Sequence, residues 1–287
     1  MTAWLFRPVP RARVAWLRML LYAFIWADVL ALRPWVRLHG DVPGILYKPL
    51  AIGNLFHLPT PTHTFTTTVM VLLLATSAVC ATGRSPRALG TLVAFLYLEW
   101  MVIAFSYGKV DHDRFGFLVA LFVLPTVGAA SFDDHEPDER AGWAVRCIQL
   151  GAVATYFLAV IAKARFGHGL LTWMNSTTLL RAVVRRGTFI SDPLMHNPWT
   201  LHVTQWLIVA MELASPLLLV RGRPGRWMLI TLVTFHAVTF ACLTIAFWPH
   251  LMTLLAFVPL ENLKTPNWRR VRHRLLSNPP AARARAG

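Results

Sequence analysis

Long uncharged apolar blocks dominate this sequence, and they restrict the available folds more than any other feature. The blocks are close to the ~20 residues that a helix needs to cross a bilayer core of ~30 Å. Short stretches rich in Arg, Pro, Gly and Asp separate them. Charged residues make up 14% of the chain, whereas a soluble domain carries about 25%. The sequence therefore predicts a chain surrounded mostly by lipid.

The spacing of these blocks predicts an all-α fold, a polytopic transmembrane helical bundle of about eight spans with interfacial helices. Pro61 and Pro198 stand where a helix can start without losing a hydrogen bond, and Gly83 stands just beyond a predicted helix end. The predicted spans are residues 14–32, 65–83, 89–107, 115–131, 144–163, 200–220, 227–247 and 248–261.

The distribution of Lys and Arg predicts how the bundle is oriented. If the N-terminus is cytoplasmic, the inside segments carry more Lys and Arg than the outside segments, although the outside segments are longer. This favours a multi-pass protein of the cell membrane with both termini in the cytoplasm. The chain then divides into a cytoplasmic N-terminal segment (1–13), a transmembrane domain (14–262) and a basic cytoplasmic tail (263–287).

The net charge of +15 is explained by this topology rather than by a nucleic-acid partner. The basic residues are dispersed over loops and tails, without a stacking platform or a nucleic-acid-binding motif, so the predicted partner is the lipid bilayer. Two outside stretches, 33–64 and 164–199, are long for simple connections. We expect them to contain interfacial helices that lie at headgroup depth and shield a site between the spans.

Polar residues inside the apolar blocks are the candidates for function, because a charge at the bilayer centre costs at least ~2.5 to 3.5 kcal/mol. Gln149, Tyr156 and Lys163 follow at steps of seven and therefore share a helix face. Gln205 and Glu212 are likewise seven apart in the next span. We expect these faces to converge with His236 from the seventh span. A desolvated lysine there loses its proton more easily, and its neutral amine is a base.

Structural interpretations of the same residues stand beside the functional one. Lys163 is near a helix end, where a lysine can extend to the headgroups, and Glu212 can serve as a structural partner for a cation. His236 can be a core histidine with one hydrogen bond. Asp28 can cap a helix or pair with Arg18. The histidines form no compact ligand pattern, so no metal site is predicted.

The segment Tyr156-Phe157-Leu158-Ala159-Val160-Ile161-Ala162-Lys163-Ala164-Arg165, followed by Trp173, resembles the central motif of the vitamin K-dependent γ-carboxylase membrane domain. That superfamily is also called HTTM. Three further matches occur in the family's order, namely Val110-Asp111-His112-Asp113, Met211-Glu212-Leu213-Ala214-Ser215-Pro216 and Phe235-His236. The resemblance covers roughly residues 10 to 262, so residues 14–262 are expected to form an HTTM/carboxylase-like transmembrane domain.

The resemblance implies a reaction and a site for it. In the carboxylase, the lysine that matches Lys163 deprotonates vitamin K hydroquinone, and oxygen then converts the anion into a base that removes a γ-proton from peptide glutamate. The carbanion captures carbon dioxide and the quinone becomes an epoxide. Reduced vitamin K or menaquinone is therefore the implied cofactor, with oxygen and carbon dioxide for carboxylation, and a secreted peptide or protein is the implied substrate.

Lys163 is accordingly the candidate catalytic base, at the extracytoplasmic end of its span. The candidate substrate- or cofactor-binding residues are Tyr156, Glu212, His236, His112, Gln149 and Gln205. A family histidine that stabilises the carbanion falls by spacing near Ala130 and Ser131, where this chain has none, and the family's lysine pair is Ala162-Lys163 here. The resemblance therefore supports hydroquinone chemistry more strongly than glutamate carboxylation.

Two other classes of function compete with an enzyme. A membrane domain of this kind can be a non-catalytic accessory, immunity or assembly protein that keeps the fold without the reaction. A transporter is the weaker alternative, because the sequence shows no inverted repeat and no pair of broken helices.

Overall fold

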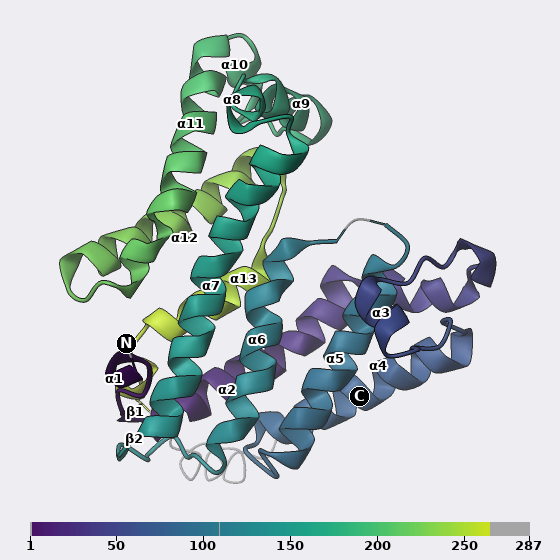
Figure 1. Cartoon of the computed structure of the whole chain (residues 1–287), viewed down its shortest axis with the longest axis vertical. Helices are drawn as coiled ribbons and strands as arrows, with labels where there is room; N and C mark the ends of the chain where they lie inside the picture. Colours follow the sequence, from purple (N-terminus) through teal and green to yellow (C-terminus); the bar gives the residue numbers. More distant parts are fainter. Residues whose placement is uncertain (1, 109, 265–287) are drawn as a thin grey trace, which may run out of the picture.

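The protein is almost entirely helical, as the computed structural model in Figure 1 shows, and this confirms the all-α prediction. The structure describes residues 2–108 and 110–264, so the predicted tail at 263–287 lies almost wholly outside the described residues. The strands are β1 (Val9–Pro10) and β2 (Pro137–Asp138). The α-helices are α1 (Thr2–Leu5), α2 (Arg11–Ala27), α3 (Ala51–Leu55), α4 (His63–Ala81), α5 (Ala88–Phe105), α6 (Phe115–Val123), α7 (Glu139–Phe166), α8 (Leu170–Trp173), α9 (Thr177–Arg186), α10 (Asp192–Met195), α11 (Pro198–Ala214), α12 (Arg223–Leu243) and α13 (Trp248–Leu254).

Shorter helical turns extend several of these helices or stand between them. A π-helical turn, Asp28–Leu32, continues α2, and 3-10 turns follow α6, α11 and α13. The 3-10 turns are Pro34–Asp41, Gly44–Leu46, His112–Arg114, Leu124–Val127, Ser215–Leu219, Leu255–Phe257 and Leu260–Asn262.

Six helical segments in the described part of the chain are long and apolar enough to cross a membrane, so the prediction of about eight spans was wrong. The six segments are Arg11–Leu32, His63–Ala81, Ala88–Phe105, Glu139–Phe166, Pro198–Leu219 and Arg223–Leu243. They correspond to six of the predicted spans. The two predicted spans at 115–131 and 248–261 instead form the short helices α6 and α13, each followed by a 3-10 turn.

Both short helices are enclosed by protein, which explains why their apolar sequences do not require full membrane length. Phe117, Ala120 and Leu121 of α6 are completely buried, and His250 and Leu254 of α13 are almost so. Pro125 begins the 3-10 turn after α6, and Gly128 then turns the chain with a positive φ of 80°. An apolar run of 10 to 14 residues is more often a buried core helix than a span, and these two segments belong to that class.

Contacts between distant segments define two ends of the bundle. Val9 pairs with Asp138 in the two-stranded sheet, and the Arg13 guanidinium donates to the Glu261 carboxylate. We call this the basal end. The opposite, distal end holds the turns after α2, the loop between α5 and α6, and α9. α6 and α13 are shorter than the six segments of full membrane length in the described part of the chain.

Helix starts follow local sequence signals. The Thr62 hydroxyl accepts a hydrogen bond of 3.2 Å from the Phe65 backbone N–H at the start of α4. The Asp138 carboxylate accepts one of 2.8 Å from Ala141 at the start of α7. Such side chains satisfy backbone N–H groups that have no partner within the helix. Gly83, with φ 80°, ends the α4 segment where the sequence predicted a helix end.

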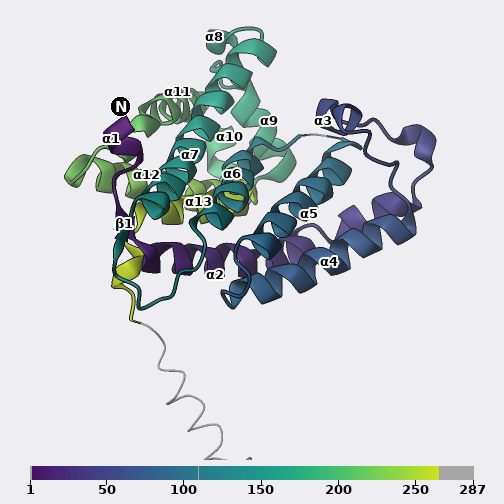
Figure 2. The same cartoon turned by 60° about the horizontal axis from the view of Figure 1, so that its bottom comes forward.

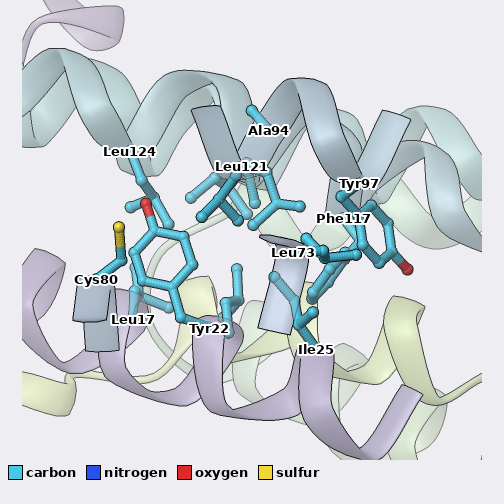
Figure 3. Packing of buried hydrophobic residues seen from close by; sticks show 14 of the residues in the cluster. Leu17, Tyr22, Ile25, Leu73, Cys80, Ala94, Tyr97, Phe117, Leu121 and Leu124 are labelled. Atoms are coloured by element: carbon cyan, nitrogen blue, oxygen red, sulfur yellow. The ribbon is translucent and has the colours of Figure 1, made fainter. Parts of the chain in front are cut away.

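The main apolar core lies between α2, α4, α5, α6 and the first half of α7. Figure 3 shows its centre, where Tyr22 from α2, Tyr97 from α5 and Phe117 from α6 fill the space between helices. A smaller core joins the second half of α7 to α12 and α13 through Tyr156, Leu232 and Leu254. α7 therefore belongs to both cores and connects the two parts of the molecule.

The outer helices expose apolar side chains, as expected for helices that face lipid. Only 28% of the most apolar stretch of α4 and 22% of that of α12 is buried inside the protein. The view in Figure 2 shows α4 along one side of the bundle and α11 and α12 on the other side of α7. The predicted interfacial stretches 33–64 and 164–199 fold into short helices and turns at the distal end. Together these features suggest a multi-pass membrane protein.

Candidate functional site

α7 carries the polar face that the steps of seven predicted. Its 28 residues begin at the capped Asp138 and run from the basal to the distal end. Gln149 and Tyr156 are buried along it, and the Lys163 side chain is 16% exposed near its distal end. The face turns toward α11, α12, α13 and the 3-10 turn after α13, where these three residues find partners.

Lys163 forms an ion pair with Glu212 of α11. Its Nζ atom lies 2.6 Å from Oε1 and 2.6 Å from Oε2 of Glu212, so the ammonium donates to both carboxylate oxygens. The Glu212 side chain is 7% exposed, and the Trp173 ring covers Nζ at 5.0 Å from the ring centroid. Lys163 is therefore turned inward, toward α11, instead of extending to the headgroups.

Tyr156 and His236 meet about two helix turns along α7 from Lys163, toward the basal end. The Tyr156 hydroxyl lies 2.9 Å from His236 Nε2, and Glu212 lies within electrostatic range of the phenol. The His250 ring packs edge-on against Tyr156 with centroids 4.5 Å apart, and the His236 and His250 ring centroids are 5.5 Å apart. The structure thus brings Lys163, Glu212, Tyr156, His236 and His250 into one polar cluster.

His250 is the member of this polar cluster that sequence reasoning missed. Its side chain is 2% exposed, and neither ring nitrogen has a hydrogen-bond partner among the described residues. The other ring nitrogen of His236, Nδ1, also has none there. A neutral imidazole has one donor and one acceptor, and leaving a buried polar atom unsatisfied costs about 1 to 3 kcal/mol. Three such atoms side by side indicate a place where a polar ligand or water belongs.

Gln149 and Gln205 lie outside the polar cluster and hold neighbouring segments in place. The Gln149 side-chain amide donates to the Ala256 carbonyl at 2.8 Å, which ties α7 to the turn after α13. The Gln205 amide donates to the Trp173 carbonyl, and its oxygen accepts from the Leu179 N–H at 3.3 Å. Gln205 therefore positions Trp173 above the Lys163 ammonium.

His112 lines a cavity of about 1010 Å³ at the distal end. Phe247 stands between this cavity and the polar cluster: its ring centroid lies 6.3 Å from that of His112 and 5.3 Å from that of His236. The cavity is bounded by the turns after α2, the loop between α5 and α6, α9, and the loop between α12 and α13. This volume is at the upper end of the range for small-molecule sites, which is about 300 to 1,000 Å³.

A second buried polar group links α2, α5 and the turn before α6. The Arg114 guanidinium donates to Asp28 Oδ2 at 2.6 Å and lies 2.6 Å from the Tyr97 hydroxyl, which also bonds to Asp28 at 2.9 Å. The expected pairing of Asp28 with Arg18 was wrong, because Arg18 donates to the Gly128 and Leu124 carbonyls at the basal end. Asp28 and Arg18 are ten residues apart, which places them almost three helical turns from one another.

In the part of the chain that the structure describes, no three His, Cys, Asp or Glu side chains are grouped to hold a metal ion. The polar cluster offers an ammonium, a carboxylate, a phenol and two imidazoles inside apolar surroundings. These groups can move a proton and hydrogen-bond a hydroxyl or carbonyl group of a ligand.

Fold and site together define an all-α membrane bundle with a buried Lys–Glu pair beside a Tyr–His pair. Comparison of the chain with protein-family models, with curated proteins and with solved structures gave no match. Any function must therefore be argued from the site itself.

Proposed function

We propose that this chain is a multi-pass membrane protein, similar to the membrane domain of the vitamin K-dependent γ-carboxylases, that removes a proton from a reduced isoprenoid quinone. The observation that carries the proposal is the Lys163–Glu212 pair, in which Nζ lies 2.6 Å from both carboxylate oxygens inside an apolar bundle. Such a pair in the interior of a membrane domain is costly and marks a functional site by default.

The geometry supports a shared role of Lys163 and Glu212 in proton transfer. While both carboxylate oxygens accept from the ammonium, Lys163 has no lone pair to offer a substrate. A proton taken from a hydroxyl group must therefore end on Glu212. The products are then a neutral carboxyl, a lysine ammonium and a substrate oxyanion, and the ammonium stabilises the new negative charge.

Tyr156, His236 and His250 are suited to hold the quinone ring. Their rings pack against one another, and the unsatisfied nitrogens of His236 and His250 are groups that can hydrogen-bond to the oxygen atoms of a hydroquinone. Phe247 and Trp173 close the polar cluster on two sides and limit the entry of water. Exclusion of water protects a reactive anion and strengthens its contacts with the pair.

The test is epoxide formation from vitamin K hydroquinone and menaquinone hydroquinone under oxygen, by purified protein in nanodiscs. We expect Lys163→Met and Glu212→Gln to lower the yield to the nonenzymatic background, a loss of at least about 10²-fold for a lost acid–base group. The double variant Lys163→Met/Glu212→Gln removes both charges at once, so no unpaired charge remains buried. Arg165→Gln, at an exposed cation near the same helix end, is the matched control.

Thermal unfolding in detergent checks that each variant is folded. A folded wild-type protein that gives no epoxide above background would contradict the proposal for these quinones. Equal yields from the wild type and a folded double variant would show that the pair is a structural link between α7 and α11. That outcome would favour a non-catalytic accessory, immunity or assembly role.

A further inference from the structure

The large distal cavity differs in charge from the polar cluster, and arginine is the commonest residue type in its lining. Five arginines line it: Arg33, Arg114, Arg181, Arg185 and Arg186. The lining residues that the structure describes include two carboxyls, those of Asp111 and Asp113. The cavity therefore has an excess of positive charge, and the distribution of that charge depends on which arginines are paired.

Two of the five arginines are neutralised by the protein. Arg33 donates to the Asp111 carboxylate, and Arg114 donates to the buried Asp28 at 2.6 Å. Arg181, Arg185 and Arg186 have no ion pair or hydrogen bond with any side chain in the described part of the chain. Three arginines thus remain against the single carboxyl of Asp113.

α9 presents these three arginines to the cavity as one face of an amphipathic helix. The residues that line the cavity recur at helical spacing and are Thr178, Arg181, Ala182, Arg185 and Arg186. The other face is apolar: Val183 is buried against Leu201 of α11 and Leu243 of α12. Packing of the apolar face fixes the direction in which the arginines point, so the charge on the cavity side is built into the fold.

We propose that the distal cavity binds the phosphate group of an anionic ligand, held by Arg181, Arg185 and Arg186. The guanidinium fork matches the oxygens of phosphate and of carboxylate alike. The charge balance favours phosphate, because a phosphate monoester carries about −1.5 to −2 charges at neutral pH whereas one carboxylate carries −1. The cavity volume of about 1010 Å³ leaves room for the group to which the phosphate is attached.

A lipid headgroup and a soluble phosphate compound are both sources of this chemistry. Apolar side chains beside the arginines are open to the surroundings: Phe189 is 84% and Val184 67% exposed. A helix with arginines on one side and exposed apolar residues next to them is typical of the membrane surface, where lipid phosphates are concentrated. The proposal uses neither Lys163 nor Glu212, so its outcome and that of the epoxide assay are independent.

The experiment measures two phosphate probes on purified full-length protein. The protein is placed in phosphatidylcholine nanodiscs that include phosphatidic acid, and native mass spectrometry counts the phosphatidic acid molecules that remain bound after its release. Calorimetry measures the affinity of the protein for inorganic pyrophosphate. The test variant is the triple Arg181→Gln/Arg185→Gln/Arg186→Gln. The matched control is Arg221→Gln/Arg223→Gln/Arg226→Gln, which removes three exposed arginines from the turn before α12 and from the first turns of α12.

We expect the test variant to bind at least tenfold more weakly than the wild type and the control to change less than threefold. Binding of phosphatidic acid alone identifies a lipid source, binding of pyrophosphate alone a soluble one, and binding of both the shared phosphate chemistry. Equal weakening in the two triple variants would overturn the proposal, because general surface charge would then explain the binding. It would also be overturned if folded wild-type protein bound neither probe, or bound a glutamate-rich peptide in preference to both.

Discussion

Asp113 shows at the scale of one residue how burial sets the chemistry of the distal cavity. Its side chain is buried between Arg114 and the cavity, and its Oδ1 atom has no hydrogen-bond partner among the described residues. Burial is the largest influence and raises the pKa of Asp113 to about 6, although Arg114 and Arg33 act in the opposite direction. The folded protein therefore holds a proton on Asp113 at pH values where the unfolded chain has lost it.

This difference predicts how stability depends on pH. The pKa of Asp113 is 3.8 in its ordinary state and about 6 in the fold. The protonated side chain therefore adds to the free energy of unfolding in full below pH 4, and this stabilisation is lost as pH rises through 6. The loss amounts to roughly 3 kcal/mol at most. Melting temperatures are measured in detergent from pH 4 to 7. The melting temperature of the wild type should fall over this range through the loss of the Asp113 proton, and that of Asp113→Asn should not show this fall. Asp133→Asn, at an exposed carboxyl, should retain it; equal slopes in the two variants would contradict the assignment.

At the residue scale, the sequence could group residues of the candidate site only where they lie on the same helix. The steps of seven placed Gln149, Tyr156 and Lys163 on one face because helix periodicity is a local property. Which residues they meet depends on how helices pack, and sequence spacing does not encode that. Gln149 consequently meets the Ala256 carbonyl instead of the polar cluster. His250 was missed although a histidine inside a predicted span, at Trp248-Pro249-His250, was itself a signal.

At the scale of helices and strands, close packing at glycines decides how helices approach one another. A Cβ atom on Gly142, near the start of α7, would lie 2.1 Å from the Arg7 carbonyl oxygen. Gly151 of α7 lies against Gly116 of α6, and a Cβ atom there would be 3.4 Å from the Gly116 Cα. Small residues permit such backbone contacts in membrane proteins, where lipid supplies no hydrophobic force to press helices together.

Gly142→Ala should therefore destabilise the protein. The alanine gains up to about 1 kcal/mol of helix propensity, but the clash with backbone atoms of Arg7 forces the N-terminal segment away at a cost of about 1 to 3 kcal/mol. We expect a melting temperature in detergent that is lower by several degrees. Gly108→Ala, where a Cβ atom meets nothing within 4 Å, should leave it within one degree. A neutral Gly142→Ala would show that the segment around Arg7 does not pack closely on α7.

Six helical segments were predictable because their apolar runs have full membrane length and their starts carry caps such as Thr62 and Asn197. α6 and α13 were not predictable as short helices. Hydropathy reports only that a segment avoids water. A helix that faces lipid and a helix that is enclosed by protein therefore have similar hydropathy. The lengths of α6 and α13 are set instead by Pro125 with Gly128 and by the turns around Pro259, which the neighbouring helices accommodate.

On the whole-molecule scale, the two ends of the bundle have different roles. The basal end holds the β1–β2 pair and the Arg13–Glu261 contact, whereas the distal end holds the cavity and lies nearer the Lys163–Glu212 pair. We propose that the basal end is cytoplasmic, because basic residues are enriched in the segments that meet there.

Cysteine labelling tests this orientation. In a variant with Cys80, Cys147 and Cys242 replaced by alanine, Asn54→Cys reports on the distal end and Ser131→Cys on the basal end; both positions are exposed. An impermeant maleimide should label Asn54→Cys on intact cells, and label Ser131→Cys only after the membrane is permeabilised. The reverse pattern would place the candidate site on the cytoplasmic side.

The basal contacts also govern the order in which the molecule can be completed during synthesis. Arg11 bonds to Asp138, which follows it by 127 residues, and Arg13 bonds to Glu261, which follows it by 248. The first span therefore enters the membrane long before either partner has left the ribosome. Residues made long after the first span therefore hold it in place, so a chain that stalls before Glu261 leaves Arg13 without its carboxylate and exposes an unfinished bundle to quality-control proteases.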